Sequence, residues 1–390
     1  MSTEQTWLLK LYQTMRSFFL GVVLGFSLIA IGTLALWYNE GTYIKTNDAI
    51  IEAQGKVVEI PDITLVDTSL DGKLVHATGP AVTEDTLTDS MFGISTVAIK
   101  LKTKVTYYQW KETKHTKTVK DSDGDDTTEI TYTYAKAWTS KPIDSSKFYN
   151  SSLRKANKIL IKVEEEELLA ENVTFGAYTL PFFLKNAITG DSSIKANIAD
   201  EKKNEINRRF TDDDINYIHT SGEIIYLGRD STNPAIGDVQ ISFSKIEPTE
   251  ISIIARVSGN TFEPFAAASD TDFHLLVMGA ASADAMLTKA KSDNTFMAWL
   301  TRIFCVLLII GGFRLGFRQI SALTRPIPLL GHVINTGVWL AATGLGLIWS
   351  FLAMSITWLY FRPAIGITLV VAALGLLAFL IVRGRRQNCG

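Results

Sequence analysis

Four long apolar runs constrain this chain most, because each is long enough to cross a lipid bilayer. A helix needs about 20 mainly apolar residues to span the hydrocarbon core of a membrane. The runs predict spans at residues 18–38, 296–313, 333–354 and 363–382. One span precedes a long polar region and three follow it. The chain is therefore expected to be a multi-pass membrane protein.

The first apolar run is expected to stay in the mature protein. The apolar region of a secretory signal is about 7–15 residues long and ends at a cleavage site between small residues. This run is longer, and it ends in the bulky residues Leu36, Trp37 and Tyr38. We predict a retained anchor. A cleaved signal peptide is the alternative, and an intact N-terminus in the mature protein would exclude it.

Arginine clusters predict how the spans are oriented. Cytoplasmic loops next to spans carry an excess of Lys and Arg. Lys10 and Arg16 precede the first span. Two further clusters set the topology: Arg314, Arg318 and Arg325 between spans two and three, and Arg383, Arg385 and Arg386 after span four. With four spans, all these residues fall on one side, which we assign to the cytoplasm.

This topology divides the chain into tails, loops and one large domain. The tails 1–17 and 383–390 and the loop 314–332 are expected to be cytoplasmic, and residues 39–295 to form the extracytoplasmic domain. Both termini then lie in the cytoplasm.

The polar region alternates in the manner of β-strands. Residues 96–113 and 127–140 are rich in Val, Thr and Tyr, and a polar stretch separates them. This pattern predicts a long hairpin. Helices are expected where the domain meets the membrane: Ile44, Ile51 and Val58 recur at seven-residue spacing, and residues 282–294 have the charge pattern of a capped helix. We predict an α+β membrane protein whose outer domain is mainly antiparallel sheet.

Catalytic and metal-binding motifs do not emerge from the sequence. The two cysteines, Cys305 and Cys389, do not form a pair at metal-ligand spacing, and the five histidines are scattered. Residues 121–126, "DSDGDD", suggest a calcium loop, but Asp126 stands where such a loop needs glycine, so a hairpin tip is favoured. The net charge of -2 does not indicate a nucleic-acid partner. We therefore predict no catalytic, metal-binding or cofactor-binding residues, and no cofactor.

Two features of the spans are expected to shape helix packing. Gly21 and Gly25 form a G-x-x-x-G motif, which lets another backbone approach closely. Arg302 lies inside the second span, where a charge must reach the interface or find a partner. In the predicted topology Glu40, at the outer end of the first span, lies at the same level. We predict a Glu40–Arg302 ion pair at the membrane boundary, and snorkelling of Arg302 is the alternative.

Several stretches resemble the transmembrane protein 43 (LUMA) family, in the same order along the chain. They are "YNEGTYIKT", "GKLVHATG", "VTYYQWKET", "YTYAKAWTSKPIDSSKF", "PAIGDVQISFS", "IIARVSGNTFEPF" and "YFRPAIGITL". The resemblance implies four spans and a large lumenal domain, and no enzymatic motif. For animal members it also implies a location in the endoplasmic reticulum and the inner nuclear membrane. There it implies association with emerin, with lamins and with other copies of the same protein.

The tail before the first span is shorter here than in animal members of that family. We therefore expect a bacterial or other microbial member. The location would then be the inner membrane with a periplasmic domain, whereas a eukaryotic member would lie in the endoplasmic reticulum or inner nuclear membrane.

The expected function is that of a non-enzymatic scaffold. The chain would self-associate and organise membrane protein complexes or membrane structure through its outer domain, with the bilayer, other copies and other membrane proteins as partners. A channel or transport subunit is the first alternative, although His332, Asn335 and Arg302 are nearly the only polar residues available to line a path. An enzyme that uses the outer domain is the second.

Overall fold

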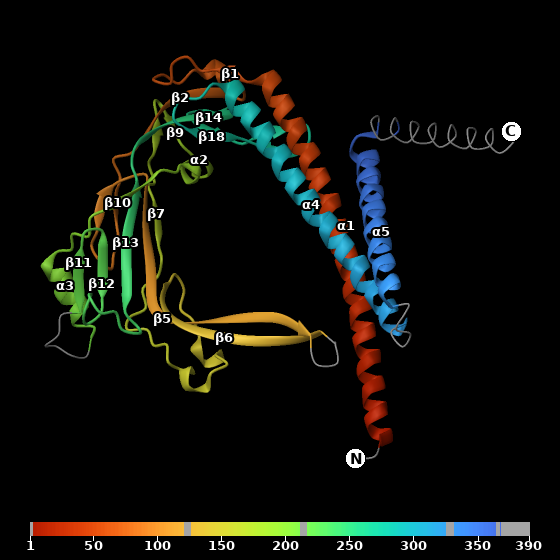
Figure 1. Cartoon of the computed structure of the whole chain (residues 1–390). Coiled ribbons are helices and arrows are strands. Elements are labelled where there is room, and N and C mark those ends of the chain that lie inside the picture. The colour runs from red at the N-terminus through yellow and green to blue at the C-terminus, as the bar shows by residue number, and fades with distance from the viewer. Residues whose placement is uncertain (1–2, 121–125, 211–216, 325–330, 364–366, 368–390) are drawn as a thin grey trace. The chain divides into compact units, whose positions relative to one another are not determined.

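The computed structural model describes residues 3–120, 126–210, 217–324, 331–363 and 367. The chain divides into two compact units. The helical unit comprises the described residues of 1–56, 265–273 and 284–390, and the β unit comprises those of 57–264 and 274–283. Figure 1 shows the elements of each unit.

Three helices of the helical unit are long and apolar enough to cross a membrane. They are α1 (Thr3–Lys56), α4 (Ala283–Thr324) and α5 (Gly331–Phe361). Contacts between their side chains make α4 antiparallel and α5 parallel to α1. Figure 1 shows the three helices side by side. The fourth expected span, 363–382, falls almost wholly outside the described residues.

These helices continue past the apolar runs from which they were predicted. Helix α1 reaches Lys56, and α4 includes the expected 282–294 helix from Ala283 on, the second span and part of the 314–332 loop. The predicted domain 39–295 therefore comprises the β unit and three segments of the helical unit, 39–56, 265–273 and 284–295. A charged residue ends an apolar run but does not by itself end a helix. The ends of the predicted spans therefore differ from the ends of the helices.

The seven-residue spacing of Ile44, Ile51 and Val58 predicted a helix beyond the first span, and α1 extends to Lys56. Ile44 is buried, whereas Ile51 is 52% exposed and Val58 lies beyond the helix. A seven-residue repeat shifts by only about 20° around a straight α-helix, so Ile44 and Ile51 lie on nearly the same face of α1. The spacing therefore predicted the helix but not the burial of each residue.

A short hairpin from the polar region belongs to the helical unit. Strands β16 (Phe265–Ala267) and β17 (Thr271–Phe273) pair with each other. The loop between them is fastened to α1, because Ala268 N–H donates to the Glu52 carboxylate and Ser269 Oγ to the Lys45 carbonyl. Lys56 also lies over the Phe265 ring at 5.4 Å.

The β unit contains two seven-stranded sheets and one two-stranded sheet in its described residues. The first sheet has the order β1-β2-β8-β9-β15-β14-β18, with β2 also paired to β14. Its strands are β1 (Val58–Glu59), β2 (Leu74–Val82), β8 (Thr174–Phe175), β9 (Tyr178–Thr179), β14 (Thr249–Ser258), β15 (Thr261–Glu263) and β18 (Leu275–Met278). All its pairings are antiparallel except β1–β2 and β9–β15.

The second sheet carries a long two-stranded ribbon. Its order is β11-β12-β13-β5-β6, with β10 on β13 and β7 on β5. Its strands are β5 (Lys100–Lys120), β6 (Asp126–Thr139), β7 (Glu167–Leu169), β10 (Asp191–Ile194), β11 (Ile218–Ser221), β12 (Ile224–Leu227) and β13 (Val239–Ile246). The ribbon is β5 from Tyr107 on, paired with all of β6, and it extends away from the sheet in Figure 1. It confirms the predicted hairpin.

Short elements complete the β unit. Strands β3 (Thr86–Thr88) and β4 (Ser95–Val97) form the two-stranded sheet. The remaining helices are α2 (Phe182–Ala187), α3 (Asp200–Asn207) and the 3₁₀ turns η1 (Thr68–Leu70), η2 (Ser145–Lys147) and η3 (Ser151–Leu153).

Each large sheet of the β unit has its own apolar core. Phe175, Tyr178 and Leu184 are fully buried in the core on the first sheet. Leu227 and Ile206 are fully buried in the core on the second sheet. Alternating strands place one row of side chains on such a core, as Leu101, Val105 and Tyr107 of β5 do. This is why the period-two pattern predicted a strand within residues 96–113.

Candidate functional site

A buried ion pair joins the first two long helices. Arg302 of α4 donates from Nε to Oε1 and from Nη2 to Oε2 of Glu40 in α1, and the second bond is 2.8 Å long. The Glu40 side chain is 0% exposed and that of Arg302 is 9% exposed. Paired, planar contacts of this kind are the strongest geometry available to arginine and carboxylate. The structure therefore brings the two residues of the predicted pair together.

Aromatic side chains surround this pair. Trp358 of α5 donates its indole N–H to Glu40 Oε2 at 2.8 Å. The Arg302 guanidinium lies 5.0 Å from the centre of the Tyr43 ring and 4.9 Å from the Trp299 ring. Aromatic faces attract a guanidinium that is shielded from water. We call Glu40, Arg302 and Trp358 the Glu40 cluster, because one carboxylate connects α1, α4 and α5.

The neighbours of Glu40 in the sequence also hold the helices together. Asn39 donates from Nδ2 to the Ala298 carbonyl of α4 at 3.3 Å. A Cβ on Gly41 would lie 2.7 Å from Cζ of Phe361 in α5, so glycine makes room for that ring. In the segment "NEG", Asn39 thus contacts α4, Glu40 contacts both α4 and α5, and Gly41 contacts α5.

The geometry of the Glu40 cluster is suited to a structural role. Both carboxylate oxygens accept bonds, and the guanidinium is bound and stacked. A charged pair removed from water is costly to break, because each partner would then be buried without compensation. The cluster therefore locks three helices at one level.

Gly25 provides a second close contact between α1 and α4. A Cβ on Gly25 would meet the Gly312 carbonyl oxygen at 2.7 Å, and a Cβ on Gly312 would meet the Gly25 carbonyl oxygen at 2.6 Å. Gly21, one turn earlier, is also buried. The close approach predicted for this motif thus occurs at Gly25 within one chain. Its use between chains stays a prediction.

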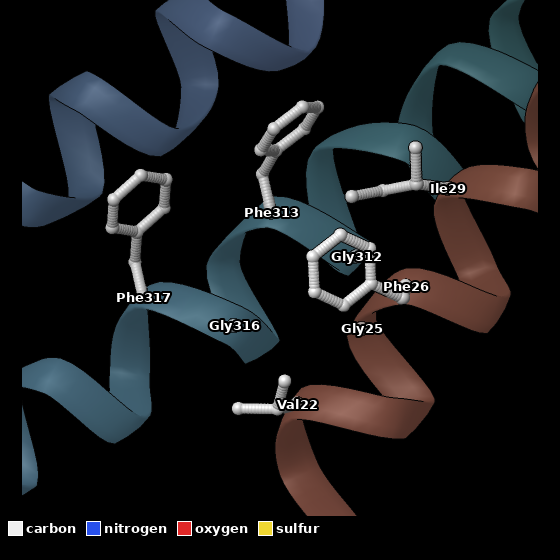
Figure 2. Close-up of a pocket in the computed structure, with 8 residues that line it drawn as sticks. All are labelled: Val22, Gly25, Phe26, Ile29, Gly312, Phe313, Gly316 and Phe317. Atoms are coloured by element: carbon white, nitrogen blue, oxygen red, sulfur yellow. The ribbon is translucent and has the colours of Figure 1, made fainter.

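An apolar cavity lies beside this glycine contact. Its volume is about 320 Å³. Figure 2 shows the lining residues, all from α1 and α4: Val22, Gly25, Phe26, Ile29, Gly312, Phe313, Gly316 and Phe317.

The arginines that set the predicted topology are described only in part. Arg314 is exposed, and its guanidinium lies 5.5 Å from the centre of the Trp339 ring of α5. The side chain of Arg318 and all of Arg325, Arg383, Arg385 and Arg386 lie outside the described residues. The membrane orientation stays a prediction.

The sequence did not assign Trp358 to the Glu40 cluster. One signal was available, since a buried indole N–H usually has a hydrogen-bond partner and the spans contain few acceptor side chains. Among the described residues, no group of three His, Cys, Asp or Glu side chains could hold a metal ion.

Comparisons with known proteins agree with the resemblance. The sequence pattern of the family described as Transmembrane protein 43 matches residues 107–363. The chain is 26% identical to Transmembrane protein 43 of Homo sapiens over 375 residues, which cover 94% of this chain and 90% of the relative. It is also 26% identical to the Transmembrane protein 43 homolog of Drosophila melanogaster over 370 residues, 93% of this chain and 94% of the relative. No solved structure matches the chain significantly.

Proposed function

The chain belongs to the transmembrane protein 43 family, and we propose that it is a non-enzymatic membrane scaffold. It would self-associate and organise membrane protein complexes or membrane structure. The β unit would contact partners outside the cytoplasm, and both termini would lie in the cytoplasm. Other copies of the chain and other membrane proteins are the proposed protein partners.

The way the helical unit uses its polar side chains supports a scaffold. Glu40, Arg302 and Trp358 bind one another, and Trp349 of α5 donates to Thr33 Oγ1 of α1 at 2.9 Å. These groups hold helices together. Arg302, which the alternative channel reading would place on a polar path, is bound and almost fully buried.

The ribbon of the β unit is the observation that carries the proposed self-association. Strand β6 pairs with β5 along its whole length and with no other strand among the described residues. An edge strand offers unpaired N–H and C=O groups to another chain. If the β6 strand of a second copy pairs with this β6 strand, both copies contribute the same backbone groups to the interface.

The groups on this edge follow from the register. Trp110 N–H and C=O both bond to the Asn157 side chain, so the pair Trp110–Lys136 does not exchange backbone hydrogen bonds. Bonded and non-bonded pairs alternate in antiparallel sheet. Ile130, six residues before Lys136, therefore directs its N–H to the free edge, and the N–H of Thr131 points to β5.

A paired substitution tests this proposal. Ile130→Pro removes an outward donor, which an edge strand tolerates, whereas Thr131→Pro removes a donor to β5. The particle mass is measured in vesicles prepared directly from the membrane. We expect oligomers for the unsubstituted chain. Ile130→Pro should give a smaller particle that is still folded, whereas Thr131→Pro should disrupt the ribbon itself. A chain that is monomeric in these vesicles, or an oligomer that Ile130→Pro leaves intact, would overturn the proposal.

A further inference from the structure

The cavity between α1 and α4 lies in the first predicted span and at the end of the second. Its α4 lining starts at Gly312 and Phe313, in the span, and continues to Gly316 and Phe317, the first turn of the predicted loop 314–332. Gly25 precedes Glu40 by fifteen positions in α1. At about 1.5 Å per residue this places the cavity about 22 Å along the helix from the Glu40 cluster. The hydrocarbon core of a bilayer is about 30 Å thick, so this position is inside it if Glu40 lies at one boundary.

The chemistry of the cavity excludes polar ligands. Its lining is made of apolar side chains and glycine backbone. Figure 2 shows the Phe313 and Phe317 rings on α4 and the Phe26 ring on α1. Apolar cavities hold no water, because water needs polar partners. An empty cavity would also leave these rings without contacts on one side.

Among the described residues, the cavity borders side chains of α1 that are exposed. Phe26, on its rim, is 70% exposed, and the nearby side chains of Phe19 and Val23 are 65% and 57% exposed. In a membrane such side chains face acyl chains. The same acyl chains therefore have direct access to the cavity.

The size of the cavity favours one narrow chain over a helix. A methylene group is similar in size to a water molecule, which takes about 30 Å³ in the liquid, so the cavity holds on the order of ten such groups. A helix with its side chains is about 10–12 Å across. Gly25 itself is already in close contact with Gly312 of α4.

We propose that this cavity is a binding site for one acyl chain of a membrane phospholipid. The acyl chain would lie against Gly316 and between the phenyl rings of α1 and α4, and so connect the two helices away from the Glu40 cluster. This inference depends on the spans and not on the proposed scaffold role.

Photolabelling with a lipid tests the site directly. The full chain is placed in phosphatidylcholine vesicles that contain a small share of phosphatidylcholine with a diazirine in one acyl chain. Labelled peptides are then identified by mass spectrometry. We expect label at Phe26 and Phe313 in clear excess over Phe304, which is 61% exposed on α4 outside the cavity. Equal labelling of all three, or cross-links at Phe26 between two copies, would overturn the proposal.

Two glycines of α4 supply a matched pair of variants. A Cβ at Gly316 or at Gly311 would meet nothing within 4 Å, but only Gly316 lines the cavity. Gly316→Leu should remove most of the label at Phe26 and leave that at Phe304 unchanged. Gly311→Leu should change neither. Unchanged label at Phe26 in a folded Gly316→Leu protein would contradict the site. If Gly316→Leu does not fold, the test rests on the unsubstituted chain, in which Phe26 and Phe313 must be labelled in excess over Phe304. A monomeric chain that still shows this excess would disprove only the scaffold role.

Discussion

The helical unit leaves many more of its large apolar side chains exposed than the β unit does. The β unit encloses large apolar residues such as Phe175 and Leu227, which are 0% exposed. In the helical unit, large apolar residues such as Leu34 and Phe26 are 70% exposed, while Glu40 is 0% exposed. Water drives apolar groups together, but lipid is itself apolar and gives no such drive between helices. The helical unit therefore depends on its polar contacts and on close packing, both at glycines and in the apolar cluster of Leu36, Cys305 and Ile309.

Breaking the Glu40 cluster should have the largest effect. Arg302→Met leaves the Glu40 carboxylate buried without its cation. Removing one partner of a buried pair costs about 3–5 kcal/mol. The free energy of unfolding of the full chain in lipid bicelles, measured by denaturant titration, should fall by this amount.

Two comparisons make this prediction specific to burial. The double variant Glu40→Met with Arg302→Met should recover most of the loss, because no unpaired charge remains. Arg362→Met breaks the pair between Arg362 and Asp48, whose side chains are 29% and 48% exposed, and should cost about 0–1 kcal/mol. An equal effect of Arg302→Met and Arg362→Met would show that the buried pair has no special role.

The same substitution should have different effects in the two units. Leu227→Ala opens a cavity in a core of the β unit and should cost about 2–5 kcal/mol. Leu34→Ala shortens a side chain that faces lipid and should change the free energy by less than about 0.5 kcal/mol. Denaturant titration of the full chain, followed by the β-sheet signal for the first and the helical signal for the second, measures both. Similar losses would contradict the comparison.

A methyl group should act with opposite signs at two glycines of the helical unit. Gly25→Ala places its Cβ 2.7 Å from the Gly312 carbonyl oxygen, so the helices must separate, at about 1–3 kcal/mol. Gly311→Ala meets nothing within 4 Å and should gain up to about 1 kcal/mol from helix propensity. Titration of the helical signal in bicelles measures both. A stabilised Gly25→Ala variant would show that the contact at Gly25 is not close in the membrane.

The sequence was more informative about elements than about their partners. A charge in an apolar run needs a partner, and that requirement led to the pairing of Arg302 with Glu40. The long hairpin followed from alternation. The place of the hairpin 265–273 in the helical unit could not be predicted. Its attachment to α1 rests on one backbone bond from Ala268 and one side-chain bond from Ser269, and such bonds leave no pattern in the sequence.

The cavity could not be predicted either, and the signal available for Trp358, the need of its indole N–H for an acceptor, did not identify Glu40 as that acceptor. Helices that are apolar on all sides give no sign of which face is buried. Gly25 could therefore be identified as a contact residue, but its partner Gly312 could not. In the β unit, by contrast, the alternation itself distinguishes the buried face from the exposed one.

A polar contact inside the β unit should contribute less than the Glu40 cluster does. The Tyr226 hydroxyl donates to the Asp238 carboxylate, and both residues are buried. Asp238 also accepts from Ala235 N–H at 2.7 Å, so Tyr226→Phe leaves it one partner. The variant should lose about 1 kcal/mol at neutral pH, well below the loss at Arg302. If Tyr226→Phe lowered the free energy of unfolding as much as Arg302→Met does, polar contacts would matter equally in the two units, contrary to the comparison.

This contact should also make the loss depend on alkaline pH. Burial, together with the bond to Asp238, raises the pKa of Tyr226 above its ordinary value. Above pH of about 10 the unfolded chain releases this proton while the folded chain keeps it, so the stability that the hydroxyl contributes falls as pH rises. The difference between the unsubstituted chain and Tyr226→Phe should therefore shrink above that pH. Denaturant titrations of both proteins at pH 8 and above pH 10 measure it, and a constant difference would mean that Tyr226 titrates alike in both states.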